Sequence, residues 1–83
     1  MIILIKEVHM PKLSPKSDEY FFGKWDKQPG DTVKTGDVLF EVETEKAISQ
    51  VKSQEDGILK AQEVATGDST KVGDLVATIE VAK

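Results

Sequence analysis

The chain contains no cysteine and only one histidine, His9. Without cysteine there is no disulfide framework, no thiolate nucleophile and no cysteine-based zinc site. A single histidine has no second histidine or cysteine with which to hold a metal, and no nucleophile to activate. The chain also lacks a nucleophile elbow, so a hydrolase is the weakest functional class. Any redox or thioester chemistry involving this protein would have to use sulfur brought in from outside.

Neither charge nor hydrophobic sequence is concentrated in long runs. The 11 basic and 15 acidic residues are scattered and give a net charge of -4, which argues against binding to nucleic acid or to an anionic membrane surface. The apolar run 1–5 stops at Lys6, too early for a signal-peptide core or a membrane span, and is typical of a first strand. With 83 residues, we expect a single, monomeric domain over 1–83 without a deep substrate cavity.

Two copies of a turn motif reveal an internal duplication. Gly30-Asp31 and Gly36-Asp37 are followed thirty-seven residues later by Gly67-Asp68 and Gly73-Asp74, with a lysine at the same place in each copy. Each Gly-Asp pair predicts a tight turn in which glycine takes a positive φ and aspartate binds nearby amides. A metal site on these aspartates is the minor alternative, because a dense acidic calcium loop is absent.

A weaker echo pairs the segment 23–25 with the segment 57–59. Both begin with glycine, at an offset of thirty-four residues. This pairing predicts three extra residues in the next connection of the second copy.

The remaining pattern predicts an all-β protein. Short β-prone segments recur without helical periodicity and without a Gly-rich phosphate loop. We expect about eight strands in two small antiparallel sheets packed face to face and related by a pseudo-two-fold axis. Within the second strand, a bulge at Gly23 would let Phe22 and Trp25 share one face despite their odd spacing.

A hairpin joins the two copies at the middle of the chain. Its predicted strands cover 38–43 and 47–52, and strict alternation places Leu39 on the face opposite Val38, Phe40 and Val42. Neither Asn-Gly nor Asp-Gly occurs in the connection, but a type I turn accepts ordinary residues such as Glu45 and Lys46 at its centre. The Lys46 amine would then project into water, far from the chain ends. The alternative is that Lys46 is an ordinary solvated turn residue.

The repeated Gly-Asp turns, the apolar strand, the sequence Glu-Thr-Glu-Lys-Ala at 43–47, and the motif Met-Pro-x-Leu-Ser-Pro at 10–15 together form a distinctive set. This set resembles the lipoyl domain of 2-oxo acid dehydrogenase acyltransferases (E2), over about residues 8–81. The resemblance implies a flattened β-barrel, or barrel-sandwich hybrid, of two four-stranded sheets. It implies that Lys46 is joined through an amide to lipoic acid, and that Thr44, Glu45 and Ala47 form the turn that the modifying enzyme recognises.

The resemblance also implies partners. A lipoate ligase or lipoyl transferase would modify Lys46. A thiamine-diphosphate-dependent enzyme (E1) would acylate the lipoyl group, the acyltransferase core (E2) would take the acyl group, and dihydrolipoamide dehydrogenase (E3) would reoxidise the dithiol. The domain itself would be a non-catalytic carrier, in bacterial cytoplasm or the mitochondrial matrix.

The chain departs from the family pattern at two positions. Glu45 stands where aspartate is commoner, and Tyr20 stands where glycine is usual, so the loop 12–19 is expected to differ in shape. In relatives this loop helps the first enzyme to recognise its partner. The nearest rival is a biotin carboxyl carrier-type domain, which usually has methionine on both sides of its lysine. An unmodified binding module of the same fold is a further alternative.

Overall fold

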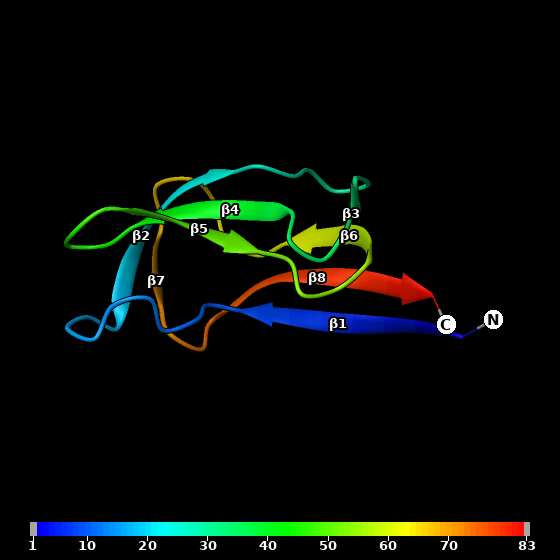
Figure 1. Ribbon diagram of the computed structural model, residues 1–83, viewed down its shortest axis with the longest axis horizontal. Coiled ribbons are helices and arrows are strands. Elements are labelled where there is room, and N and C mark those ends of the chain that lie inside the picture. The colour runs from blue at the N-terminus through cyan, green and yellow to red at the C-terminus, as the bar shows by residue number, and fades with distance from the viewer. Residues whose placement is uncertain (1, 83) are drawn as a thin grey trace.

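The computed structural model describes residues 2–82, which form two four-stranded antiparallel sheets (Figure 1). The strands are β1 Ile3–His9, β2 Glu19–Trp25, β3 Thr32–Val33, β4 Val38–Glu43, β5 Ile48–Lys52, β6 Gly57–Gln62, β7 Ser69–Lys71 and β8 Leu75–Ala82. Their order is β1-β8-β6-β3 in one sheet and β5-β4-β2-β7 in the other. The all-β prediction is confirmed. No helix within the described range is long and apolar enough to cross a membrane.

The two sheets are copies of one another, because equivalent strands pair in the same register in each sheet. Phe22 of β2 lies opposite Val42 of β4, and Leu59 of β6 lies opposite Ile79 of β8. Both members of the second pair stand thirty-seven residues after those of the first. The predicted duplication is therefore present in the pairing of the strands as well as in the turn motif.

The predicted pairing of Gly23 with Gly57 is wrong. Each copy has a register shift, between Phe22 and Lys24 in β2 and between Leu59 and Ala61 in β6. The counterpart of Gly23 is therefore Lys60, and the offset of thirty-seven holds through this strand too. No non-glycine residue in the described chain has a positive φ, so the bulge accepts lysine, and the shared glycine was a misleading marker.

Strict alternation also fails in β4. Leu39 is fully buried, with no exposed surface, although Phe40 and Val42 beside it are buried as well. A register shift between Val38 and Phe40 turns Leu39 inward. Val76 takes the equivalent position in β8 and is equally buried. Both central strands therefore contribute an extra apolar side chain to the core, which raises the buried apolar area of a small domain.

The bulge at Gly23 has the predicted consequence for the aromatic residues. The Phe22 and Trp25 rings pack with centroids 4.9 Å apart, and each also contacts Phe40, at 5.1 and 5.4 Å respectively. The Trp25 indole N–H donates to the Val64 carbonyl at 2.9 Å. The aromatic cluster thus joins β2 to β4, the first strand of the central hairpin.

Four Gly-Asp turns close the ends of the strands. Gly30, Gly36, Gly67 and Gly73 have φ between 93° and 97°. In each turn the aspartate carboxylate accepts a hydrogen bond from the amide three residues earlier, for example Lys34 N–H to Asp37 at 3.0 Å and Lys71 N–H to Asp74 at 2.9 Å. The carboxylates are therefore used by their own turns, and the turn interpretation is confirmed.

The molecule is elongated, with extents of 43 × 20 × 19 Å. The paired ends of β1 and β8 lie at one extremity, where Ile3 is opposite Ala82, and the β4–β5 connection lies at the other (Figure 1). This is the arrangement expected from the pseudo-two-fold relation. A tether from either terminus would leave the molecule at the end opposite Lys46.

Candidate functional site

The site is the four-residue connection between β4 and β5, and Thr44 organises it. Its amide donates to the Ala47 carbonyl at 2.9 Å, and its hydroxyl donates to the same carbonyl at 3.1 Å. The hydroxyl oxygen also accepts from the amides of Lys46 and Ala47, at 3.3 and 3.4 Å. Glu45 and Lys46 form the bend without a positive φ. In a type I turn over 44–47 the Ala47 amide would donate to the backbone carbonyl of Thr44. Here it donates to the Thr44 hydroxyl oxygen instead.

Lys46 is exposed at the tip of this hairpin. Among the ion pairs within residues 2–82, none includes its amine. A primary amine in water, on a bend with a defined backbone, is accessible to an enzyme that attaches a group to it.

Two hollows of the described structure lie away from the hairpin tip. One is lined by Leu39, Val51 and Ile79 together with residues of β1, and the other by Trp25 and residues of the segment 62–68. No residue of 44–47 lines either of them. The chemistry of the hairpin tip therefore has no enclosed cavity and depends on an exposed side chain.

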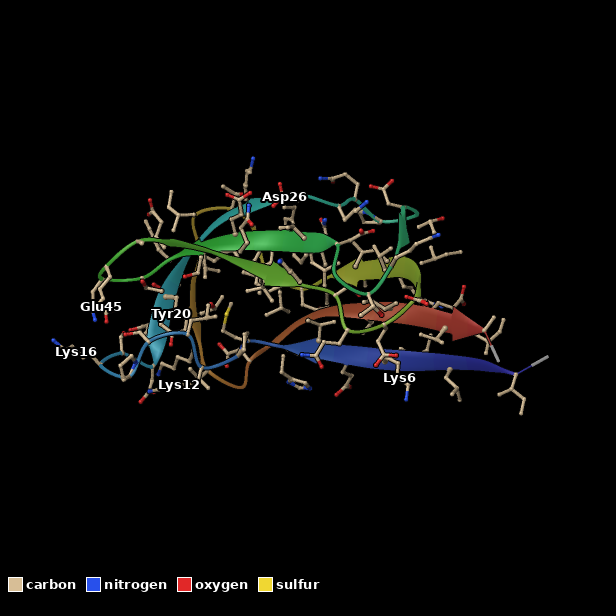
Figure 2. All side chains as sticks on the ribbon, viewed as in Figure 1. Lys6, Lys12, Lys16, Tyr20, Asp26 and Glu45 are labelled. Carbon is tan, nitrogen blue, oxygen red and sulfur yellow. The ribbon has the colours of Figure 1, made fainter. Side chains whose placement is uncertain are left out.

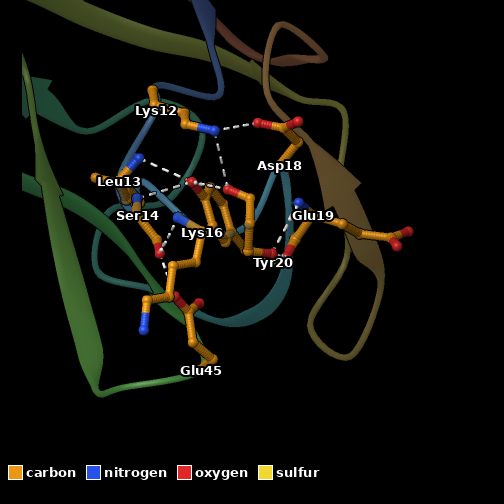
Figure 3. Close-up of polar contacts among 9 residues, drawn as sticks. Lys12, Leu13, Ser14, Lys16, Asp18, Glu19, Tyr20 and Glu45 are labelled. Carbon is orange, nitrogen blue, oxygen red and sulfur yellow. Dashed lines mark hydrogen bonds and ion pairs between the residues drawn. The ribbon is translucent and has the colours of Figure 1, made fainter.

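A second loop supports the hairpin from below. The β1–β2 connection reaches the same end of the molecule, where Lys16 and Glu45 lie close together (Figure 2). The Ser14 hydroxyl donates a hydrogen bond to the Glu45 carboxylate (Figure 3). This bond, followed by the backbone amide of Glu45 itself, lowers the pKa of the carboxyl. Glu45 is thus anchored as an anion beside Lys46.

His9 is exposed and lies outside the hairpin. Its Nδ1 is 2.8 Å from the Gly73 carbonyl oxygen and its Nε2 is 3.0 Å from the Glu7 carboxylate. Both neighbours are acceptors, so both ring nitrogens can donate only in the charged form. The Gly73 carbonyl, and after it Glu7, raises the pKa of His9. Within the described chain no cluster of three possible metal ligands includes this ring.

The residues that the sequence assigned to the site, Thr44, Glu45, Lys46 and Ala47, are brought together on one hairpin tip. Ser14 was missed as a site residue, because a serine between leucine and proline looks like any surface loop residue. Its 4 % exposure and its bond to a residue thirty-one positions away appear only in three dimensions. Tyr20, recognised only as an unusual residue, is buried beneath the same loop.

Comparison with known proteins places this hairpin in a family context. A family model described as "Biotin-requiring enzyme" (biotin/lipoyl) matches residues 6–79. In structure, the chain is similar to the lipoyl domain of the 2-oxoglutarate dehydrogenase complex from Azotobacter vinelandii. That similarity has a TM-score of 0.72 at 23% identity and covers 88% of this chain and 92% of the other. At this level of identity, the likeness supports the fold.

Sequence relatives extend this picture. The dihydrolipoyllysine-residue succinyltransferase component of the Bacillus subtilis 2-oxoglutarate dehydrogenase complex is 36% identical over 73 residues, covering 88% of this chain. The dihydrolipoyllysine-residue acetyltransferase component of the Zymomonas mobilis pyruvate dehydrogenase complex is 40% identical over 77 residues, covering 92%. The pyruvate dehydrogenase E1 component subunit beta of Rhizobium meliloti is 38% identical over 74 residues, covering 88%. The matches span only 18%, 18% and 16% of these relatives.

Proposed function

This chain belongs to the biotin/lipoyl attachment family, and from that membership we propose that it is a lipoyl carrier domain whose prosthetic group is attached to Lys46. The observation that carries the proposal is the position of this lysine. Its amine is exposed on a structured hairpin tip, at the end of an elongated molecule opposite the paired ends of β1 and β8. A carrier needs a fixed, accessible base for a mobile arm and a tether that does not obstruct it.

The residues present at the tip suit a lipoyl group. Attachment requires an exposed amine that loses a proton and forms an amide with the activated carboxyl of the acid, whose activating group departs. Lys46 meets this requirement, because neither a salt bridge nor a covering side chain competes for it in the described structure. When attached, lipoic acid supplies two sulfur atoms for carrying acyl groups and electrons, and the chain has no cysteine of its own to do so.

The choice of lipoyl over biotin is supported by the neighbours of Lys46. Glu45 and Ala47 occupy the places where biotinyl domains usually have methionine. Two of the relatives described above are named for a dihydrolipoyllysine residue. An acidic and a small residue next to the lysine lack the long apolar side chains that two methionines would offer a biotin-attaching enzyme.

We propose that the partners are those of a 2-oxo acid dehydrogenase complex. They comprise a lipoate ligase or lipoyl transferase, a thiamine-diphosphate-dependent E1, an acyltransferase E2 core and dihydrolipoamide dehydrogenase (E3). Membership of an acyltransferase subunit fits two of the relatives, while the Rhizobium meliloti relative is an E1 subunit. Such a carrier would work in bacterial cytoplasm or in the mitochondrial matrix.

The proposal is tested by intact-mass measurement after incubation with ATP and either lipoate plus a lipoate ligase or biotin plus a biotin ligase. We expect the wild type to gain the mass of one lipoyl group and Lys46→Ala to gain none. Lys16→Ala is the matched control, because Lys16 is another exposed lysine at the same end of the molecule, and it should be modified like the wild type. Addition of biotin alone would identify the rival carrier, and no addition of either would favour an unmodified binding module.

A further inference from the structure

Tyr20 uses its whole hydrogen-bonding capacity to shape the loop beneath the Lys46 hairpin. Its side chain is buried, with 2 % exposure. The phenol oxygen accepts from the amides of Leu13 and Ser14, at 2.9 and 3.0 Å, and donates to the Ser17 carbonyl at 2.9 Å (Figure 3). A phenol has one donor and two acceptor positions, so all are filled. One hydroxyl therefore fixes three backbone groups of the loop.

Ser14 transmits this order to the hairpin. Its amide is held by Tyr20, and its hydroxyl oxygen accepts from the Lys16 amide at 3.2 Å while donating to the Glu45 carboxylate. The Ser14 hydroxyl is thereby oriented by one bond that it donates and one that it accepts. Among the hydrogen bonds of the described residues, the Ser14–Glu45 bond is the one that joins the loop 11–18 to the connection 44–47.

The hairpin needs such support because its other polar contacts are internal. The bonds made by Thr44 define the bend but lie within the connection itself, so they do not fix the tip relative to the two sheets. Glu45 directly precedes Lys46. Holding the Glu45 carboxylate against the buried Ser14 therefore limits the directions in which the next residue can point.

We propose that Tyr20 and Ser14 are positioning residues that hold the hairpin, through Glu45, in the orientation in which a lipoate-attaching enzyme accepts Lys46. This inference rests on the proposed function. An enzyme that must choose one lysine among eleven basic residues can recognise a fixed backbone shape. A hairpin that adopts this shape only part of the time binds more weakly in proportion to the fraction in the accepted state.

The test is a double-mutant cycle of Ser14→Ala and Glu45→Ala, with lipoate, ATP and a lipoate ligase. We expect each single change to lower kcat/KM by about three- to tenfold through a higher KM. The lost hydrogen bond lowers the fraction of the domain in the accepted orientation, and this weakens binding of the domain to the ligase. The kcat/KM of the double variant should be no lower than that of the less active single variant, because both substitutions remove the same Ser14–Glu45 hydrogen bond. Glu43→Ala, across Thr44 from Glu45, is the matched control, and its effect should add to that of Ser14→Ala.

Hydrogen exchange gives a readout that does not need the enzyme. In Ser14→Ala and in Tyr20→Phe, the Lys46 and Ala47 amides should exchange faster, while the Val42 amide in the core of the sheet keeps its protection. Unchanged exchange at the tip, or independent effects of Ser14→Ala and Glu45→Ala, would overturn the inference. Failure of the wild type to accept lipoate would instead refute the proposed function, and the exchange data would still decide whether Tyr20 and Ser14 order the tip.

Discussion

Gly57 and Gly36 are both required by the fold, but for different physical reasons that a pair of substitutions can separate. A Cβ added to Gly57 would lie 2.2 Å from the Glu80 carbonyl oxygen and 3.0 Å from Ile79 Cγ2. A Cβ added to Gly36 would meet nothing within 4 Å, but the residue has a φ of +97°. We therefore expect a steric cost at Gly57 and a purely conformational cost at Gly36.

The expected magnitudes follow from these contacts. The obstacle at Gly57 is backbone of β8, and β6 is held between β8 and β3, so neither strand can move aside freely. We expect Gly57→Ala to cost about 3 kcal/mol, the upper part of the range for overpacking. Gly36→Ala should cost about 1 to 2 kcal/mol, the usual penalty for left-handed backbone. In a domain of this size, each kcal/mol lowers Tm by about 4 to 8 °C.

The assay is equilibrium unfolding in guanidinium chloride followed by Trp25 fluorescence, because this indole packs on Phe22 and Phe40. Asparagine provides the control, since it adopts positive φ more readily than alanine. Gly36→Asn should recover part of the loss seen in Gly36→Ala, whereas Gly57→Asn should be no better than Gly57→Ala. A Gly57→Ala protein with nearly wild-type stability would refute the steric argument, and equal losses for alanine and asparagine at 36 would refute the conformational one.

Three further changes test separate parts of the structure. Tyr20→Phe should lower stability by about 1 to 3 kcal/mol, because it leaves backbone groups of the loop without partners, and an unchanged denaturation midpoint would contradict this. Lys46→Ala should alter stability by less than about 0.5 kcal/mol, as expected for an exposed residue without an ion pair, whereas a large fall in Tm would mean a structural role for the side chain. In an NMR titration, His9 should have a pKa above 6.5 that falls in Glu7→Gln. Because the pKa of His9 is raised in the folded state, protonated His9 contributes to stability below pH 6.5, and this contribution disappears as the pH rises through the folded pKa. A His9 pKa at or below 6.5 would exclude the charged pair with Glu7.

Much of the fold was predictable because the duplication repeats its turn chemistry. Gly-Asp turns require a residue that accepts positive φ and a short acceptor side chain, and both requirements are visible in single residues such as Gly36 and Asp37. The position of Lys46 at the hairpin follows from the same symmetry. The place of Leu39 could not be predicted, since a bulge changes which side chains face the core without any special residue. The false match of Gly23 to Gly57 has the same cause, because the bulge in β6 occurs at Lys60.

The support beneath the hairpin was also beyond prediction. The sequence marked Tyr20 as unusual and the loop 12–19 as altered, but gave no sign that Ser14 and Glu45 meet. Their contact depends on how the β1–β2 loop folds over the end of the sheets, which no local pattern encodes. Long-range side-chain bonds of this kind are set by the packing of the whole domain.

The most direct test of the central claim is fragmentation mass spectrometry of the chain after modification by lipoate, ATP and a lipoate ligase, with peptides covering all its lysines. We expect a single lipoyl group on Lys46, with every other lysine unmodified. A lipoyl group on Lys16 or another surface lysine, or a distribution over several, would contradict the claim that this fold presents one amine at its tip for attachment.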